Sequence, residues 1–215
     1  MKIFSRIILL CLVVSMTLGL LTGCETTQEK IAALSGTWTM VVNDTEEEAL
    51  ELLKSIEMYE EEIALIDLTS LKYVQLVEFT TEKTYRFSFD AEATRACIRE
   101  FFANAFDALY AGRSTLNEVY QTSFDEMTEE EFKEYYRLIY DVDSFETMLD
   151  VFADSAYDYE ALAEDWETGT YNIRFNEIHC TITGETQAES LKYSINGDTL
   201  VLTYIDGVET YTRSK

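Results

Sequence analysis

Residues 171–213, YNIRFNEIHCTITGETQAESLKYSINGDTLVLTYIDGVETYTR, contain the pattern that decides the fold of this chain. Apolar and polar residues alternate in this segment with a period of two, which is typical of strands that bury one face. Polar turns interrupt the alternation, and one of them is Asn196-Gly197, a dipeptide that favours tight hairpins. The segment therefore predicts a meander in which each strand pairs with the next.

The same alternation occurs earlier in the chain, beginning at Gly36 and again on both sides of a turn near Thr81. Together the segments predict about eight strands, centred on residues 39, 76, 86, 173, 180, 193, 202 and 210. Sequential antiparallel strands in this number suit an up-and-down barrel, because closure removes unpaired strand edges. We therefore expect an α+β protein built on a roughly eight-stranded antiparallel up-and-down β-barrel.

Two helical insertions interrupt the strands, at about residues 44–68 and 91–167. Both contain helix-start signals of the form Thr-x-x-Glu, at Thr45 and at Thr128. The insertions follow the first and third strands, and in an up-and-down barrel these connections leave from the same end. We therefore expect the helices to cap one mouth of the barrel, where an entrance or a plug would lie.

The first 24 residues predict the location of the protein. Lys2 and Arg6 precede an apolar run, residues 7–21, that is too short to span a bilayer comfortably. The following step, LTGC over residues 21–24, resembles the lipobox of bacterial lipoproteins. This resemblance implies cleavage before Cys24, diacylation of its sulfur, and a protein anchored by lipid at the extracytoplasmic face of the cell membrane. We accordingly expect a signal peptide over residues 1–23, a lipidated tether over 24–35 and the barrel domain over 36–215.

Two segments of the barrel domain carry a second resemblance. The sequence LSGTW at residues 34–38 leads a Gly-x-Trp motif into the first strand, and YSINGDTLVL at residues 193–202 precedes the final Tyr211-Thr212-Arg213. Both resemble the lipocalin-like, or calycin, barrels of small bacterial lipoproteins. The resemblance implies that Arg213 packs over Trp38 as a structural pair. It also implies that small apolar ligands bind in the barrel.

The chain is strongly acidic, with 41 Asp and Glu against 16 Lys and Arg. Sixteen of the acids fall in residues 125–167, within the second helical insertion, and ten fall in residues 44–67. This charge disfavours nucleic acid as a partner, because phosphates would be repelled. Two interpretations of the acidic helices stay open: a solvated face that keeps the protein soluble, and a docking face for a basic protein partner.

Conventional reactive groups are scarce in this sequence. Cys97 and Cys180 are expected to be either two buried thiols or a disulfide. His179 is the only histidine, and there is no Cys-x-x-Cys motif, so the sequence supports neither a metal site nor a cofactor. No catalytic constellation is present, and we do not expect an enzyme.

Aromatic residues on the inward phase of the strands are the candidate ligand-binding residues. An eight-stranded barrel is just wide enough to be filled by side chains or to hold one small ligand, and both alternatives stay open here. Tyrosine hydroxyl groups would provide polar contacts within such a pocket. The candidates are Trp38, Tyr85, Phe87, Tyr171 and Tyr193.

These features lead to two functional hypotheses. The first is a lipid-anchored extracytoplasmic binding protein for a small apolar or amphipathic ligand. The alternative is a protein-interaction module at the cell envelope that uses its acidic helical cap to engage a basic partner. A continuous void inside the barrel favours the first hypothesis, and a packed interior favours the second.

Overall fold

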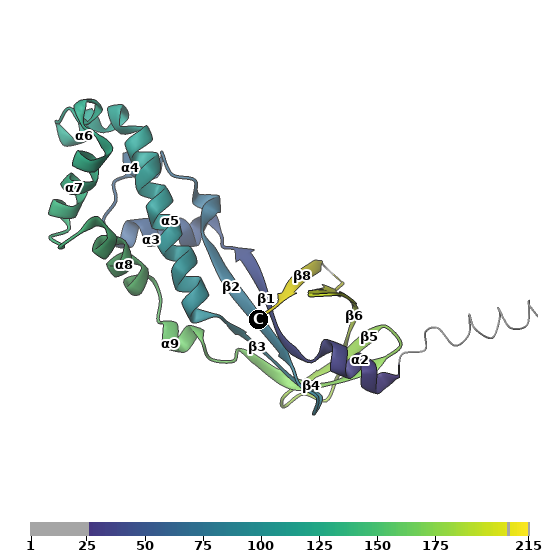
Figure 1. Ribbon diagram of the computed structural model, residues 1–215. Coiled ribbons are helices and arrows are strands. Elements are labelled where there is room, and N and C mark those ends of the chain that lie inside the picture. The colour runs from purple at the N-terminus through teal and green to yellow at the C-terminus, as the bar shows by residue number, and fades with distance from the viewer. Residues whose placement is uncertain (1–25, 206, 215) are drawn as a thin grey trace, which may run out of the picture.

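The computed structural model describes residues 26–205 and 207–214 (Figure 1). Eight strands form a closed barrel in sequence order, and each strand runs antiparallel to its neighbours. The predicted fold is confirmed. The strands are β1 (Gly36–Asn43), β2 (Lys72–Phe79), β3 (Thr84–Phe89), β4 (Glu167–Arg174), β5 (Glu177–Ile182), β6 (Glu189–Asn196), β7 (Thr199–Thr203) and β8 (Val208–Arg213).

The barrel closes at a short seam between β1 and β8. Only Trp38 with Arg213 and Thr39 with Thr212 are paired across it, whereas β1 pairs with β2 along eight residues. The Thr39 hydroxyl group adds a hydrogen bond to the Thr212 carbonyl at 3.2 Å. The seam is thus the shortest ladder in the barrel, and a backbone hydrogen bond from the Ser214 N–H to the Thr37 carbonyl at 2.9 Å continues it.

Both helical insertions leave the barrel at the rim where β1 and β3 end, and Figure 1 shows their helices grouped at this end. The long helix α5 contacts β2 and also packs against α8. The helices share an apolar core of their own, separate from the core inside the barrel. They are α3 (Glu46–Ser55), α4 (Glu60–Ile63), α5 (Ala91–Ala111), α6 (Asn117–Tyr120), α7 (Glu129–Ile139), α8 (Phe145–Ala156) and α9 (Tyr159–Leu162), with short 3₁₀ turns at Leu68–Ser70, Arg113–Leu116 and Phe124–Glu126.

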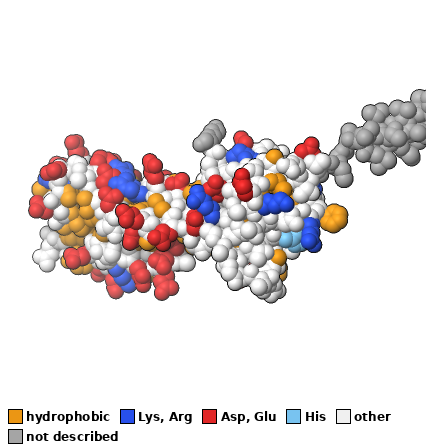
Figure 2. Space-filling view, turned by 90° about the horizontal axis from the view of Figure 1, so that it is seen from below, with side chains coloured by type: hydrophobic (Ala, Val, Ile, Leu, Met, Phe, Trp, Pro, Cys, Tyr) orange, Lys and Arg blue, Asp and Glu red, His pale blue; other side chains and the backbone are white. Residues whose placement is uncertain are grey.

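Acidic side chains crowd the helical end of the molecule and are sparser over the barrel (Figure 2). Some of this charge holds helices together. Arg99 on α5 donates a hydrogen bond to Asp150 on α8 at 2.9 Å, and Arg95 bonds to Asp154 one turn further along. These partly exposed pairs align α5 with α8, although exposed ion pairs contribute little to stability.

The opposite end of the barrel is sealed by a helix that the sequence analysis did not predict. Residues 27–34, assigned there to the tether, form α2 (Thr27–Leu34), which begins with a capping box between Thr26 and Glu29. Ile31 and Leu34 of this helix are buried in the barrel core. A helix of eight residues is unstable alone, and packing against the barrel supplies the stability that its local sequence lacks.

Gly169 on β4 provides a sharp test of packing inside the barrel. A Cβ atom here would lie 2.3 Å from the Thr181 carbonyl oxygen and 2.7 Å from the Tyr85 ring. We expect Gly169→Ala to lower the free energy of unfolding by about 2 kcal/mol, because the backbone or the ring must shift. Urea denaturation measures this loss. Gly207→Ala is the control, since nothing lies within 4 Å of that position. Equal losses in the two variants would contradict the crowding.

Candidate functional site

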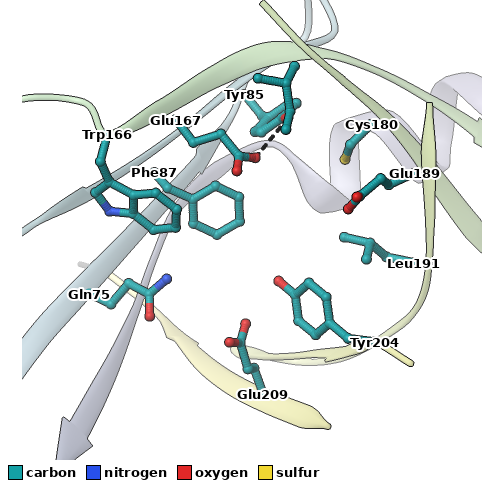
Figure 3. A pocket seen from close by; sticks show the side chains of 11 residues that line it. Gln75, Tyr85, Phe87, Trp166, Glu167, Cys180, Glu189, Leu191, Tyr204 and Glu209 are labelled. Carbon is teal, nitrogen blue, oxygen red and sulfur yellow. Dashed lines mark hydrogen bonds between the residues drawn. The ribbon is translucent and has the colours of Figure 1, made fainter. Parts of the chain in front are cut away.

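A cavity of about 150 Å³ lies at the rim from which the helical insertions leave (Figure 3). It is partly open, and its lining comes from strands β2 to β8 and from residues that directly flank them. The lining residues are Gln75, Tyr85, Phe87, Trp166, Glu167, Cys180, Ile182, Glu189, Leu191, Tyr204 and Glu209. The barrel is therefore filled at the end sealed by α2 and hollow at its mouth.

Three glutamates lie in this lining because of where their strands begin. Glu167 and Glu189 are the first residues of β4 and β6, and Glu209 is the second residue of β8. Even-numbered strands begin at the open rim. Each glutamate also shares the inward phase of its strand with a buried residue two or four positions further on, because successive side chains alternate between the two faces.

Aromatic rings form one wall of the cavity. The Phe87 ring lies 5.1 Å from Trp166 and 5.8 Å from Tyr85, measured between centroids. The Trp166 backbone N–H donates a hydrogen bond to the Phe87 carbonyl at 3.1 Å, which fixes this residue beside β3. Trp166 remains 52% exposed, so it borders both the cavity and the solvent.

The carboxylates influence the titrating groups around them. The Tyr85 hydroxyl group donates to Glu167 at 2.9 Å, and burial together with this bond raises the pKa of Tyr85. Burial, with a smaller effect of the Glu167 and Glu189 charges, raises the pKa of the Cys180 thiol to about 12. Cys180 is therefore protonated at neutral pH and is a poor nucleophile.

The structure separates the predicted ligand-binding residues into two groups. Tyr85 and Phe87 line the cavity. Trp38 and Tyr171 are buried elsewhere in the barrel core, and the Tyr171 hydroxyl group donates to the Thr80 carbonyl at 2.7 Å. Tyr193 packs at the edge of the same core and borders a surface groove at the sealed end. The last three do not line the cavity.

Trp38 and Arg213 lie together, with the guanidinium carbon 4.0 Å from the centroid of the indole ring. The indole N–H donates to the Leu34 carbonyl at 2.8 Å. Arg213 donates to the carbonyl groups of Ser35 at 2.9 Å and Ala33 at 2.6 Å. The pair therefore joins the β1–β8 seam to the end of α2 and has a structural position.

The predicted cysteine residues lie in different parts of the molecule. Cys97 is on α5, Cys180 faces the barrel interior, and both are free thiols. The disulfide alternative is thus not formed, because the chain places the two residues in separate packing units. Cys24, the predicted lipidation site, lies outside the described residues.

Trp166 and the three rim glutamates were not predicted from the sequence as part of the site. The second helical insertion was predicted to extend to residue 167, which placed Glu167 outside the barrel, and only aromatic residues were considered as inward-facing ligand contacts. Extending the two-residue period to the first residues of β4 and β6 and to the second residue of β8 would have placed all three carboxylates inside. Trp166 precedes its strand, and no periodic signal identifies it.

Comparisons with protein-family models, curated proteins and solved structures found no match for this chain. Among residues 26–205 and 207–214, no helix combines the length and the apolar character needed to span a bilayer. Within the same residues, no group of three His, Cys, Asp or Glu side chains converges closely enough to hold a metal ion.

The buried tyrosines predict a loss of stability in alkali. Burial raises the pKa of Tyr85, Tyr136, Tyr204 and Tyr211 above the ordinary value near 10. Above about pH 10 the unfolded chain loses these protons while the folded chain keeps them, so the free energy of unfolding falls as pH rises. We expect urea midpoints to decrease steadily from about pH 9 to about pH 11. A urea midpoint that does not change over this range would contradict the prediction.

Proposed function

We propose that this chain is a lipocalin-like, lipid-anchored extracytoplasmic protein that binds a small amphipathic ligand at the open mouth of its barrel. The observation that carries the proposal is the cavity of about 150 Å³ at the rim. Cavities of about this volume accommodate a molecule the size of benzene. Its lining combines apolar walls with a few polar groups, which is the usual composition of small-molecule sites.

The position of the proposed anchor is compatible with ligand entry. Cys24 precedes Thr26, the N-cap residue of α2, by two positions, and α2 seals the end of the barrel opposite the cavity. Acyl chains on Cys24 would therefore hold the sealed end toward the membrane and leave the mouth facing away. Intact-mass measurement of membrane-extracted protein tests the anchor, and Cys24→Ala should release the protein from the membrane fraction. A membrane-bound Cys24→Ala variant would contradict it.

Native mass spectrometry of the purified protein tests ligand binding. We expect a co-purifying small molecule that is retained in a Phe175→Ala variant, since Phe175 is exposed at the sealed end. We expect it to be lost in a Leu191→Trp variant, because the larger ring fills the cavity. Retention of the same adduct in Leu191→Trp would place the ligand elsewhere and contradict the proposal.

A surface groove on the helices favours a second candidate function, the engagement of a basic protein partner. The groove surrounds Phe145 and carries five glutamates, which would speed the encounter with a cationic surface. An oligolysine peptide should bind in a salt-dependent manner, and Leu191→Trp should leave that binding unchanged. A peptide affinity that does not change with salt concentration would contradict this candidate function. The groove is lined by Thr128, Glu129, Glu130, Glu131, Lys133, Glu134, Phe145 and Glu146.

A further inference from the structure

The cavity at the barrel mouth has a marked charge asymmetry. Its lining contains three carboxylates and no lysine, arginine or histidine. None of the ion pairs among the described residues includes Glu167, Glu189 or Glu209. Glu167 and Glu209 accept hydrogen bonds from the neutral hydroxyl groups of Tyr85 and Tyr211, at 2.9 and 2.8 Å. Within residues 26–205 and 207–214, the negative charge of the cavity therefore has no ion-pair partner.

The aromatic residues of the lining suit the same kind of ligand. Figure 3 shows the Phe87 and Trp166 rings side by side on one wall, with Tyr204 across the cavity and carboxylates between them. Aromatic faces attract organic cations, and rings arranged around a pocket are the known means of recognising quaternary ammonium groups. The rings and the carboxylates thus favour one ligand charge by two separate interactions.

The geometry favours an organic cation over a metal ion. The carboxylates come from β4, β6 and β8, spaced around the rim, and they are not among any three side chains close enough to bind one ion. A volume of about 150 Å³ admits a group much larger than a metal ion. A trialkylammonium group of that size contacts several walls at once, and its charge is spread over its surface.

The carboxylates of the cavity also affect the pKa values of two residues that line it, Cys180 and Tyr204. Burial is the main cause of the raised pKa of Cys180, and the charges of Glu167 and Glu189 raise it further. Burial likewise raises the pKa of Tyr204, with a contribution from Glu209. Both contributions have the sign expected where carboxylates lie beside these groups in the cavity lining.

We propose that the rim cavity binds an organic ammonium ion, with its cationic head against Phe87 and Trp166 and with Glu167, Glu189 and Glu209 as counter-charges. The apolar remainder of such a ligand would extend through the open side of the cavity. This inference rests on the proposed binding function and specifies the chemical class of its ligand.

Fluorescence titration of the full-length protein with choline tests the inference, because Trp166 lines the cavity while Trp38 is buried away from it. The comparison ligand is the uncharged isostere of choline, in which a tert-butyl group replaces the trimethylammonium group. We expect choline to bind about tenfold more tightly than the isostere, as one cation–π and charge contact predicts. A Trp166→Phe variant should lose the fluorescence change.

Charge variants distinguish the effect of the cavity carboxylates on choline binding from the effect of the protein's net charge. The triple variant Glu167→Gln, Glu189→Gln, Glu209→Gln should lose the preference for choline over its isostere. A control triple variant with the same change in net charge at the sealed end should keep that preference, and it consists of Glu82→Gln, Glu177→Gln and Asp198→Asn. If the cavity triple variant fails to fold, the single variant Glu189→Gln replaces it, because Glu189 is exposed and its substitution should leave the fold intact. This variant should weaken choline binding several-fold.

The outcomes distinguish this inference from the proposed function. If the isostere binds as tightly as choline, or if the cavity variants keep the preference, the charge assignment is wrong while small-molecule binding stands. If neither compound changes the fluorescence and native mass spectrometry shows no adduct, both the inference and the binding function fail.

Discussion

Replacing Trp38 with alanine will lower the free energy of unfolding by about 4 kcal/mol. The Trp38 side chain is fully buried, and its indole N–H holds the end of α2 through the Leu34 carbonyl. The ring also supports Arg213 at the seam, where β1 and β8 share only two paired positions. Its removal therefore leaves a cavity, frees a buried carbonyl and weakens the shortest ladder of the barrel. Urea denaturation with a comparison of m-values measures the loss.

Three further variants identify the source of this effect. Trp38→Phe keeps most of the ring and should cost about 1–2 kcal/mol, mainly through the lost hydrogen bond. Arg213→Lys removes the hydrogen bonds to two carbonyl groups, because lysine lacks the planar guanidinium group. It should lower the free energy of unfolding by a similar amount. Trp166→Ala is the control, since that side chain is half-exposed. A loss from Trp38→Ala no greater than that from Trp166→Ala would contradict the role of Trp38 at the seam.

The strands were predictable because their signals are local. The period of two and the Asn196-Gly197 turn depend only on residues close in sequence, and the structure has the corresponding hairpin between β6 and β7. Closure of the barrel joins residues about 175 positions apart, as the 173-residue separation of Thr39 and Thr212 illustrates. The sequence period alone does not determine this contact, and the expectation of closure came from the need to remove strand edges.

The cavity was harder to predict than the barrel around it. Tyr85 and Tyr171 share the inward phase, yet Tyr85 reaches the cavity and Tyr171 does not. Their difference lies along the barrel axis, and that coordinate depends on the stagger between strands. The alternation of apolar and polar residues identifies the face of the sheet on which a side chain lies. Its position along the barrel axis depends on the register between paired strands.

The sequence predicted that the helical insertions cap the barrel, but it did not predict how the helices pack against one another. They pack around their own apolar core, and a buried carboxylate lies within the insertion, that of Glu62 on α4, with 1% of its surface exposed. Glu62 accepts hydrogen bonds from the Tyr136 hydroxyl at 2.6 Å, from the Tyr59 backbone N–H at 2.7 Å and from the Tyr120 hydroxyl. Three donors from three segments therefore converge on one side chain.

Replacing Glu62 with leucine should lower the free energy of unfolding by about 3 kcal/mol or more, because three buried donors lose their acceptor together. Glu62→Gln should cost less, about 1–2 kcal/mol, since its amide oxygen still accepts hydrogen bonds. Glu61→Leu is the matched control on the same helix, where the side chain is exposed and the change should be within about 0.5 kcal/mol. Urea denaturation compares the three variants.

A spectrophotometric titration of the tyrosines tests the interaction between Glu62 and Tyr136 directly. Burial is the main cause of the raised pKa of Tyr136, and the bond to Glu62 and its charge raise it further. Removing the charge in Glu62→Gln should therefore lower that pKa, so part of the tyrosine absorbance should titrate at lower pH than in the unchanged protein. If leucine instead stabilises the chain, the carboxylate is a net cost to folding and the convergence of three donors does not compensate for its desolvation.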